Sequence, residues 1–311
     1  MKTTTLNLLS SCVVIGVLLS GCAAVQSTNS TPYKLVYSSL ESKNRSIYLS
    51  DESGQQRLRV VNATKADGYP AVSPNGQHIA FYGKYDKFKT WSIHVVDIDG
   101  TNLKRLTTAK YKWDSAPSWS ADGNAIMFTR EYKNDKGQWQ EEIWTMKPDG
   151  SEQRQLPNLL GGGASFVGNT KVLFHTHAKP SQIAMANLDG SEFVTLTHDD
   201  ADNRAPSLSP DGSQIVYLSN RDGNQEVYSM NVKGENHTRL TFNKEQDWSA
   251  TWSVDGQHIF FTSENQTGFL DVFKMRRDGS AMQKILNNGS QISSVSNVNA
   301  QALENLIRTN Q

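Results

Sequence analysis

The stretch at residues 204–217 reads RAPSLSPDGSQIVY. Two short runs of strand-forming residues flank Asp211-Gly212, a pair that favours a tight turn. Near copies of this stretch stand at residues 68–81 (GYPAVSPNGQHIAF), 115–128 (SAPSWSADGNAIMF) and 248–261 (WSATWSVDGQHIFF), with a degraded copy at 162–174 (GGASFVGNTKVLF). The pattern predicts a repetitive protein built from β-hairpins.

The repeat length indicates the kind of β protein. The turn glycine, Gly212 in the first copy, recurs at Gly76, Gly123 and Gly256, and with Thr170 in the degraded copy the spacing is 42 to 47 residues. A second hairpin motif stands between the copies, as in NVKGENHTRLT at residues 231–241. Four short strands in about 40–45 residues are typical of a β-propeller blade. We therefore expect an all-β, six-bladed propeller with four-stranded blades over residues 33–297.

The first blade has no first strand of its own, because residues 22–32 directly precede its second strand. The missing strand appears at residues 289–296 (GSQISSVS), where Val295 aligns with Trp119 and Trp252 of other copies. We expect this C-terminal strand to complete the first blade and to remove the exposed sheet edges. Residues 298–311 are expected to form a helix or tail.

The N-terminus has the features of an export signal. Lys2 precedes an apolar run at residues 8–19, which is too short to span a membrane. The run ends in Leu-Ser-Gly-Cys22, which matches a bacterial lipobox. We expect residues 1–21 to be a lipoprotein signal peptide, Cys22 to be lipidated, and residues 22–32 to be a flexible tether. The resemblance to sorting signals, with Ala23 after the cysteine, implies the outer membrane, facing the periplasm.

Composition excludes several classes of function. The chain has 31 Lys+Arg and 31 Asp+Glu, which argues against a nucleic-acid partner because a phosphate backbone requires a basic surface. The only cysteines are Cys12 and Cys22. Since the first is lost on cleavage and the second is lipidated, a cysteine nucleophile or thiolate metal site is excluded.

The SPDG turn, the following strand, SNRDGNQEVY at residues 219–228 and the Leu-Thr endings resemble the TolB-type (WD40-like) β-propeller repeat. The resemblance covers about residues 33–296. TolB carries a further α/β domain before its propeller, so we expect a stand-alone propeller lipoprotein. The resemblance implies a protein-binding role at the cell envelope. Propellers of similar fold include oligogalacturonate lyases and the propeller domains of prolyl-oligopeptidase-type enzymes.

The loops that enter the first strands are expected to ring the mouth of the central channel. Acidic residues recur there three positions before the proline, next to an aromatic or a cationic residue, and could bind a cation, a basic peptide or a sugar. The alternative is that each aspartate caps a turn. The candidate residues are Asp67, Trp113, Asp114, Arg204, Asp247 and Trp248.

The long loops between second and third strands carry aromatic residues among charged ones, as interfaces do. The candidate interface residues are Tyr85, Trp91, Tyr132 and Trp139. The alternative is that these rings pack on the rim of the propeller.

His175 and His177 alternate at the end of a strand, so both rings point to one face, and His198 could approach from the next loop. Three histidines would suit a divalent metal ion. No other cofactor is expected, and no nucleophile elbow, zinc-protease helix or phosphate loop is present.

These observations predict an envelope lipoprotein that binds a protein or peptide with its propeller. The alternatives are a metal-dependent polysaccharide lyase or hydrolase that uses the three histidines, and a structural scaffold.

Overall fold

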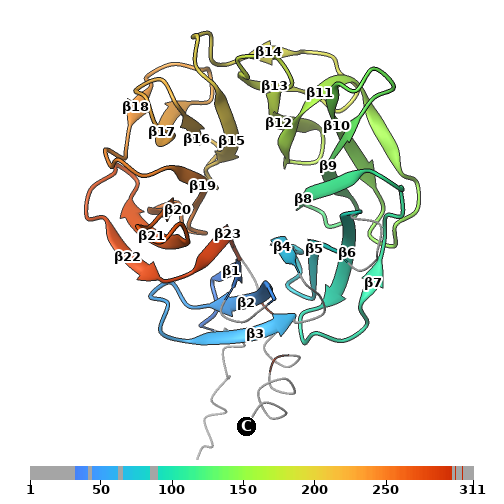
Figure 1. The fold of residues 1–311 in the computed structure, drawn as a ribbon, viewed down its shortest axis with the longest axis horizontal. Helices are drawn as coiled ribbons and strands as arrows, with labels where there is room; N and C mark the ends of the chain where they lie inside the picture. The colour runs from blue at the N-terminus through green and yellow to red at the C-terminus, as the bar shows by residue number, and fades with distance from the viewer. Residues whose placement is uncertain are drawn as a thin grey trace, which may run out of the picture.

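The computed structural model describes residues 32–40, 44–61, 66–84, 90–295, 298 and 303. In these residues the chain is an all-β propeller whose sheets surround a central axis (Figure 1). The predicted signal peptide, Cys22, nearly all of the tether, Tyr85 and most of the predicted C-terminal tail lie outside them. No helix within them is long and apolar enough to cross a membrane.

Four of the five sheets contain four antiparallel strands each. The first consists of β23 (Gly289–Ser294), β1 (Leu35–Ser39), β2 (Ser46–Ser50) and β3 (Arg57–Val61). The second consists of β4 (Asp67–Val72), β5 (His78–Gly83), β6 (Ser92–Asp97) and β7 (Lys104–Arg105). The other two are β15 (Asn203–Leu208), β16 (Gln214–Ser219), β17 (Glu226–Asn231) and β18 (Thr238–Arg239), and β19 (Asp247–Trp252), β20 (His258–Glu264), β21 (Leu270–Arg276) and β22 (Gln283–Leu286).

The remaining sheet has seven strands, so the prediction of six separate four-stranded blades is wrong. Its members in chain order are β8 (Trp113–Trp119), β9 (Ile126–Lys133), β10 (Trp139–Met146), β11 (Arg154–Val167), β12 (Lys171–Thr176), β13 (Ile183–Asn187) and β14 (Val194–Thr195).

The seven-stranded sheet arises because β11 continues without a loop through the degraded copy of the repeat. Its residues up to Leu160 pair with β10, and those from Gly161 onward pair with β12. A Cβ atom at Gly161 would lie 1.9 Å from the carbonyl oxygen of His175, so only glycine permits this close approach. The backbone therefore passes directly from one hairpin system to the next.

The chain ends meet in one sheet, as predicted. Strand β23 pairs antiparallel with β1, with Leu35 opposite Ser294 and Ser39 opposite Gly289 (Figure 1). The backbone N–H of Val295 donates a hydrogen bond to the carbonyl of Lys34 at 2.7 Å. This pairing closes the ring and leaves the innermost strands without a free edge at the chain ends.

The residues that recur in the copies of the repeat form turns and contacts between sheets. The turn glycines Gly76, Gly123, Gly212 and Gly256 have φ between 68° and 72°, in the left-handed region where glycine costs least. The indole Nε1 of Trp252 donates a hydrogen bond to the carbonyl of Ser207 in the neighbouring sheet at 3.1 Å. The repeated residues therefore build the scaffold.

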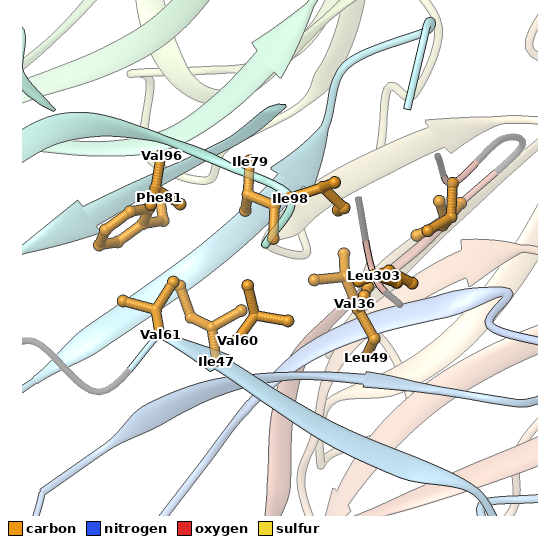
Figure 2. Close-up of a cluster of buried hydrophobic side chains, with 12 residues drawn as sticks. Val36, Ile47, Leu49, Val60, Val61, Ile79, Phe81, Val96, Ile98 and Leu303 are labelled. Carbon is orange, nitrogen blue, oxygen red and sulfur yellow. The ribbon is translucent and has the colours of Figure 1, made fainter. Parts of the chain in front are cut away.

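Apolar side chains fill the spaces between adjacent sheets. Figure 2 shows one such cluster, in which Ile47 and Val61 of the first sheet face Phe81 and Val96 of the second. The helical residue Leu303 packs into the same cluster and is buried. Burial of these side chains, at about 1.5–3 kcal/mol each, holds the sheets around the channel.

Candidate binding face at the mouth of the central channel

The innermost strands β4, β8, β11, β15, β19 and β23 line a central channel of about 540 Å³. Their channel-lining residues are mostly small, such as Ala71, Ser118, Ala164 and Ser207. Bulges shift the pairing of these strands, for instance between Arg204 and Ser207. Because a bulge changes where the following side chains point, residues before it face a different environment from the channel lining.

One face of the propeller, which we call the mouth face, carries the first residues of the innermost strands. Adjacent strands are antiparallel, so the connections between second and third strands lie on the same face. A cavity of about 520 Å³, the mouth pocket, opens there. Among the residues that line it are Glu131 of β9, Glu141 of β10, His175 of β12, Arg204 of β15 and Trp248 of β19.

Two carboxylates of the mouth pocket lie on neighbouring strands. Glu131 and Glu141 stand directly opposite each other in the antiparallel pairing of β9 and β10. Burial, reinforced by the charge of Glu141, raises the pKa of Glu131. For Glu141 burial acts in the same direction, but the hydrogen bond and charge of His175 and the charge of His177 outweigh it, so its pKa is lowered. The pocket thus holds two neighbouring carboxyl groups whose pKa values shift in opposite directions.

Basic groups lie close to these carboxyl groups. The Glu141 carboxylate lies 3.7 Å from Nε2 of His175 and 3.6 Å from Nδ1 of His177. Arg204 lies 3.5 Å from Asp202, and its charge also acts to lower the pKa of Glu131 and of Glu141. Three of the sequence-predicted residues line the mouth pocket, namely His175, Arg204 and Trp248.

The three predicted aspartates are buried inside the sheets rather than presented to the channel. Asp67, Asp114 and Asp247 are 0–1% exposed. Asp114 accepts two hydrogen bonds from Arg130, from Nε at 2.7 Å and from Nη2 at 2.9 Å. Asp247 accepts from the hydroxyl of Thr241 at 2.7 Å, and burial raises its pKa to about 6. These carboxylates are therefore held inside the sheets, at the start of β4, β8 and β19.

Three of the predicted aromatic residues lie on neighbouring strands, Trp113 on β8, Tyr132 on β9 and Trp139 on β10. The rings of Trp113 and Trp139 are in contact, with centroids 5.0 Å apart, and both are exposed. The hydroxyl of Tyr132 donates a hydrogen bond to Glu142 at 2.5 Å, and the ammonium of Lys112 lies 3.6 Å from the centroid of its ring.

Trp91 is partly enclosed by its neighbours. Its ring packs edge-on against Tyr82, with centroids 4.8 Å apart, and it is only partly exposed. Its backbone carbonyl accepts a hydrogen bond from the N–H of Asp114 at 3.1 Å. Trp91 therefore joins neighbouring sheets, whereas Trp139 is open to a partner.

The three predicted histidines do not form one cluster with a shared ligand geometry. His175 and His177 share Glu141, whereas His198 is exposed and its charge acts on His237. Within the part of the chain that the structure describes, no group of three or more His, Cys, Asp or Glu residues is arranged to hold a metal ion.

Exposed large aromatic residues concentrate on the mouth face. In the described ranges, all but Phe193 lie at or beside the start of a first or third strand of a repeat, which is the mouth end. They are Tyr69, Tyr111, Trp113, Trp139, Phe242, Trp248 and Phe269.

Sequence reasoning missed Glu131, Glu141 and Tyr69. The two glutamates lie where a long loop between second and third strands was expected, but strand pairing extends to Lys133 and resumes at Trp139. The signal available was the turn at residues 134–137, where Gly137 donates its N–H to the carbonyl of Asn134. Counting outward from that turn would have placed the two glutamates opposite each other.

Comparison with known proteins agrees with this architecture. The model of the TolB beta propeller domain matches residues 25–204, and that of the Tricorn protease N-terminal beta propeller domain matches residues 180–310. The chain is 31% identical over 130 residues to the Tol-Pal system protein TolB of Alcanivorax borkumensis, covering 38% of this chain and 30% of that protein. It is 24% identical over 213 residues to the TolB protein of Francisella tularensis, covering 66% of this chain and 48% of that protein.

Among solved structures, TolB from Acinetobacter baumannii superposes with a TM-score of 0.73 at 19% identity, covering 84% of this chain and 66% of that one. Oligogalacturonate lyase from Vibrio parahaemolyticus superposes with a TM-score of 0.56 at 13% identity, covering 82% of this chain and 74% of that one. At these identities the likeness concerns the fold alone. The chain spans less than half the length of the TolB relatives that it matches in sequence.

Proposed function

Because this chain belongs to the TolB β-propeller domain family, we propose that it is a binding module that docks a protein or peptide segment of the cell envelope on its mouth face. The observation that carries the proposal is the concentration of exposed aromatic residues around a pocket that holds two neighbouring carboxyl groups. Trp, Tyr and Arg supply most of the binding energy at protein interfaces, and well-packed pockets at their centre hold the main anchors. The mouth face offers both.

The predicted residues take different parts in this proposal. Trp113, Trp139 and Trp248 form the contact surface, and Arg204 lines the pocket that Trp248 borders. The buried Asp67, Asp114 and Asp247 hold the strands that carry these side chains. The fold likeness to oligogalacturonate lyase adds no catalytic argument, since the described histidines lack a three-residue ligand group.

The test is cross-linking in intact cells followed by purification of the full chain. A variant with Trp113→Ala, Trp139→Ala and Trp248→Ala should lose at least tenfold in the recovery of cross-linked envelope proteins. Phe193→Ala is the matched control, because Phe193 is equally exposed but lies away from the mouth face. Equal recovery by the triple variant and the wild type would refute the proposed docking face.

Attachment to the membrane is part of the same proposal. The lipobox that ends at Cys22 supports a lipid anchor, and the family supports location in the cell envelope. Cys22→Ala should shift the protein from the membrane fraction to the soluble fraction and remove the acyl mass from its N-terminal peptide. An unchanged distribution, with no acyl mass in the wild type, would contradict the anchor.

A further inference from the structure

The strongest unexplained feature of the molecule is the facing pair of glutamates in the mouth pocket. Like charges directly opposite each other on antiparallel strands destabilise a sheet. Within the described residues, neither Glu131 nor Glu141 forms an ion pair with a lysine or an arginine. Arg204 pairs with Asp202, and its charge acts on the two glutamates only at longer range. Either the repulsion between the two carboxylates serves a function, or another group relieves it.

A second, independent observation concerns two buried polar side chains of the same pocket. Thr129 is 3% exposed and His175 is 9% exposed, and both line the mouth pocket. Their Oγ1 and Nδ1 atoms have no hydrogen-bond partner among the described residues. Buried polar atoms without partners are rare and costly, so these two atoms point to a missing group.

The charge of Glu141 indicates what kind of group is missing. It lies 3.7 Å from Nε2 of His175, whose Nδ1 atom faces Gly163. The ionised carboxylates of Glu131 and Glu141 accept hydrogen bonds and line the same pocket. The pocket therefore offers carboxylate acceptors to a donor-rich cation.

The size and rim of the pocket suit a side chain rather than a small ion. A volume of about 520 Å³ exceeds what a single ion fills. Tyr69 and Trp248, which is 48% exposed, border it and can cover the methylene stem of a long side chain or face its charge.

We propose that the mouth pocket binds the guanidinium or ammonium group of an arginine or lysine side chain of the docked segment, between Glu131 and Glu141. This inference rests on the proposed function and names the chemistry that its partner must supply. The raised pKa of Glu131 agrees with it, because an adjacent cation would remove the repulsion that contributes to the shift.

The test uses the purified full chain and two matched probes, L-arginine amide and L-citrulline amide, which have nearly the same shape but differ in charge. Calorimetric titration should show saturable binding of arginine amide and at least tenfold weaker binding of citrulline amide. The double variant Glu131→Gln/Glu141→Gln should bind arginine amide at least tenfold more weakly than the wild type. It should keep or raise its melting temperature, because the mutual repulsion is gone.

The control variant is Glu192→Gln/Glu235→Gln, which removes the same charge from exposed turns on the opposite face and should bind arginine amide as the wild type does. Equal binding of the two probes, or unchanged binding by the Glu131/Glu141 variant, would overturn the inference. Saturable binding of Ca²⁺ or Mn²⁺ at these glutamates, without any binding of arginine amide, would also overturn the inference.

The same double variant separates this inference from the proposed function. If the wild type and the variant recover cross-linked envelope proteins equally and arginine amide does not bind, the cation site is refuted and the docking face stands. If arginine amide binds but the tryptophan variant recovers as much protein as the wild type, the docking face is refuted and the cation site stands.

Discussion

Replacing Asp114 by alanine tests whether this carboxylate holds the propeller together or serves a ligand. The structure supports the first role, since Arg130 donates to both carboxylate oxygens at 2.7 and 2.9 Å while the two residues are 1% and 5% exposed. The guanidinium also lies 4.2 Å from the ring centroid of Trp144. Removing one partner of a buried ion pair leaves the other charge buried and unpaired, which costs about 3–5 kcal/mol.

The expected result is a large loss of stability. Asp114→Ala should lower the free energy of unfolding, measured by urea titration of tryptophan fluorescence, by about 3–5 kcal/mol. For a domain of this size each kcal/mol corresponds to about 2 °C, so the melting temperature should fall by about 6–10 °C. Asp200→Ala, an exposed aspartate, should change stability by less than about 0.5 kcal/mol.

A double variant distinguishes the cost of leaving Arg130 buried without a counter-charge from the cost of losing the whole ion pair. Asp114→Leu/Arg130→Met removes both charges, and it should recover much of the stability, because apolar replacement of a whole buried pair is often neutral. A loss below about 1 kcal/mol for Asp114→Ala would refute the assignment of Asp114 to the scaffold.

Two further predictions concern buried groups of the scaffold. Burial raises the pKa of Asp247 to about 6, so its protonated form stabilises the folded state below about pH 3.8 and this contribution is lost as pH rises through 6. The stability of the wild type relative to Asp247→Asn should thus fall by about 2 kcal/mol between pH 4 and 7 in urea titrations, and a constant difference would contradict the shift. Gly161→Ala should cost about 3 kcal/mol or more by the same measurement, because its Cβ would lie 1.9 Å from the His175 carbonyl oxygen. Gly168→Ala, which also has a positive φ but no atom within 4 Å of the new Cβ, should cost about 1 kcal/mol, and equal losses would contradict the close approach.

Much of the fold was predictable from the sequence because a propeller repeats its turns. Asp-Gly and Asn-Gly turns recur at fixed spacing, and the column that contains Trp119 and Trp252 identified the C-terminal strand that pairs with β1. These features depend on local residue preferences, which each copy of the repeat displays independently.

The seven-stranded sheet was not predictable in the same way. Strand β11 lacks a loop between its two halves, and the three consecutive glycines at 161–163 do not reveal whether the backbone turns or continues. The direction of that segment depends on the close approach to His175, which only tertiary structure provides. The sheet count therefore differed from the count of sequence repeats.

The site was predictable in location but not in its residues. The mouth face was identified from topology, and Arg204 and Trp248 line its pocket. The aspartates are buried, and a bulge follows both Asp114 and Asp247, which the sequence repeat did not indicate. Glu131 and Glu141 were missed because a cross-strand pair is visible only once the register of the hairpin is known.

The central claim is that an envelope protein segment docks on the mouth face, and site-specific photo-cross-linking tests it most directly. A photoreactive phenylalanine analogue at Trp248, which borders the mouth pocket, should form a covalent adduct with a protein in living cells, identifiable by mass spectrometry. The same analogue at Phe193 should form none. Adducts at Phe193 but not at Trp248 would contradict the docking of a partner at the mouth of the channel.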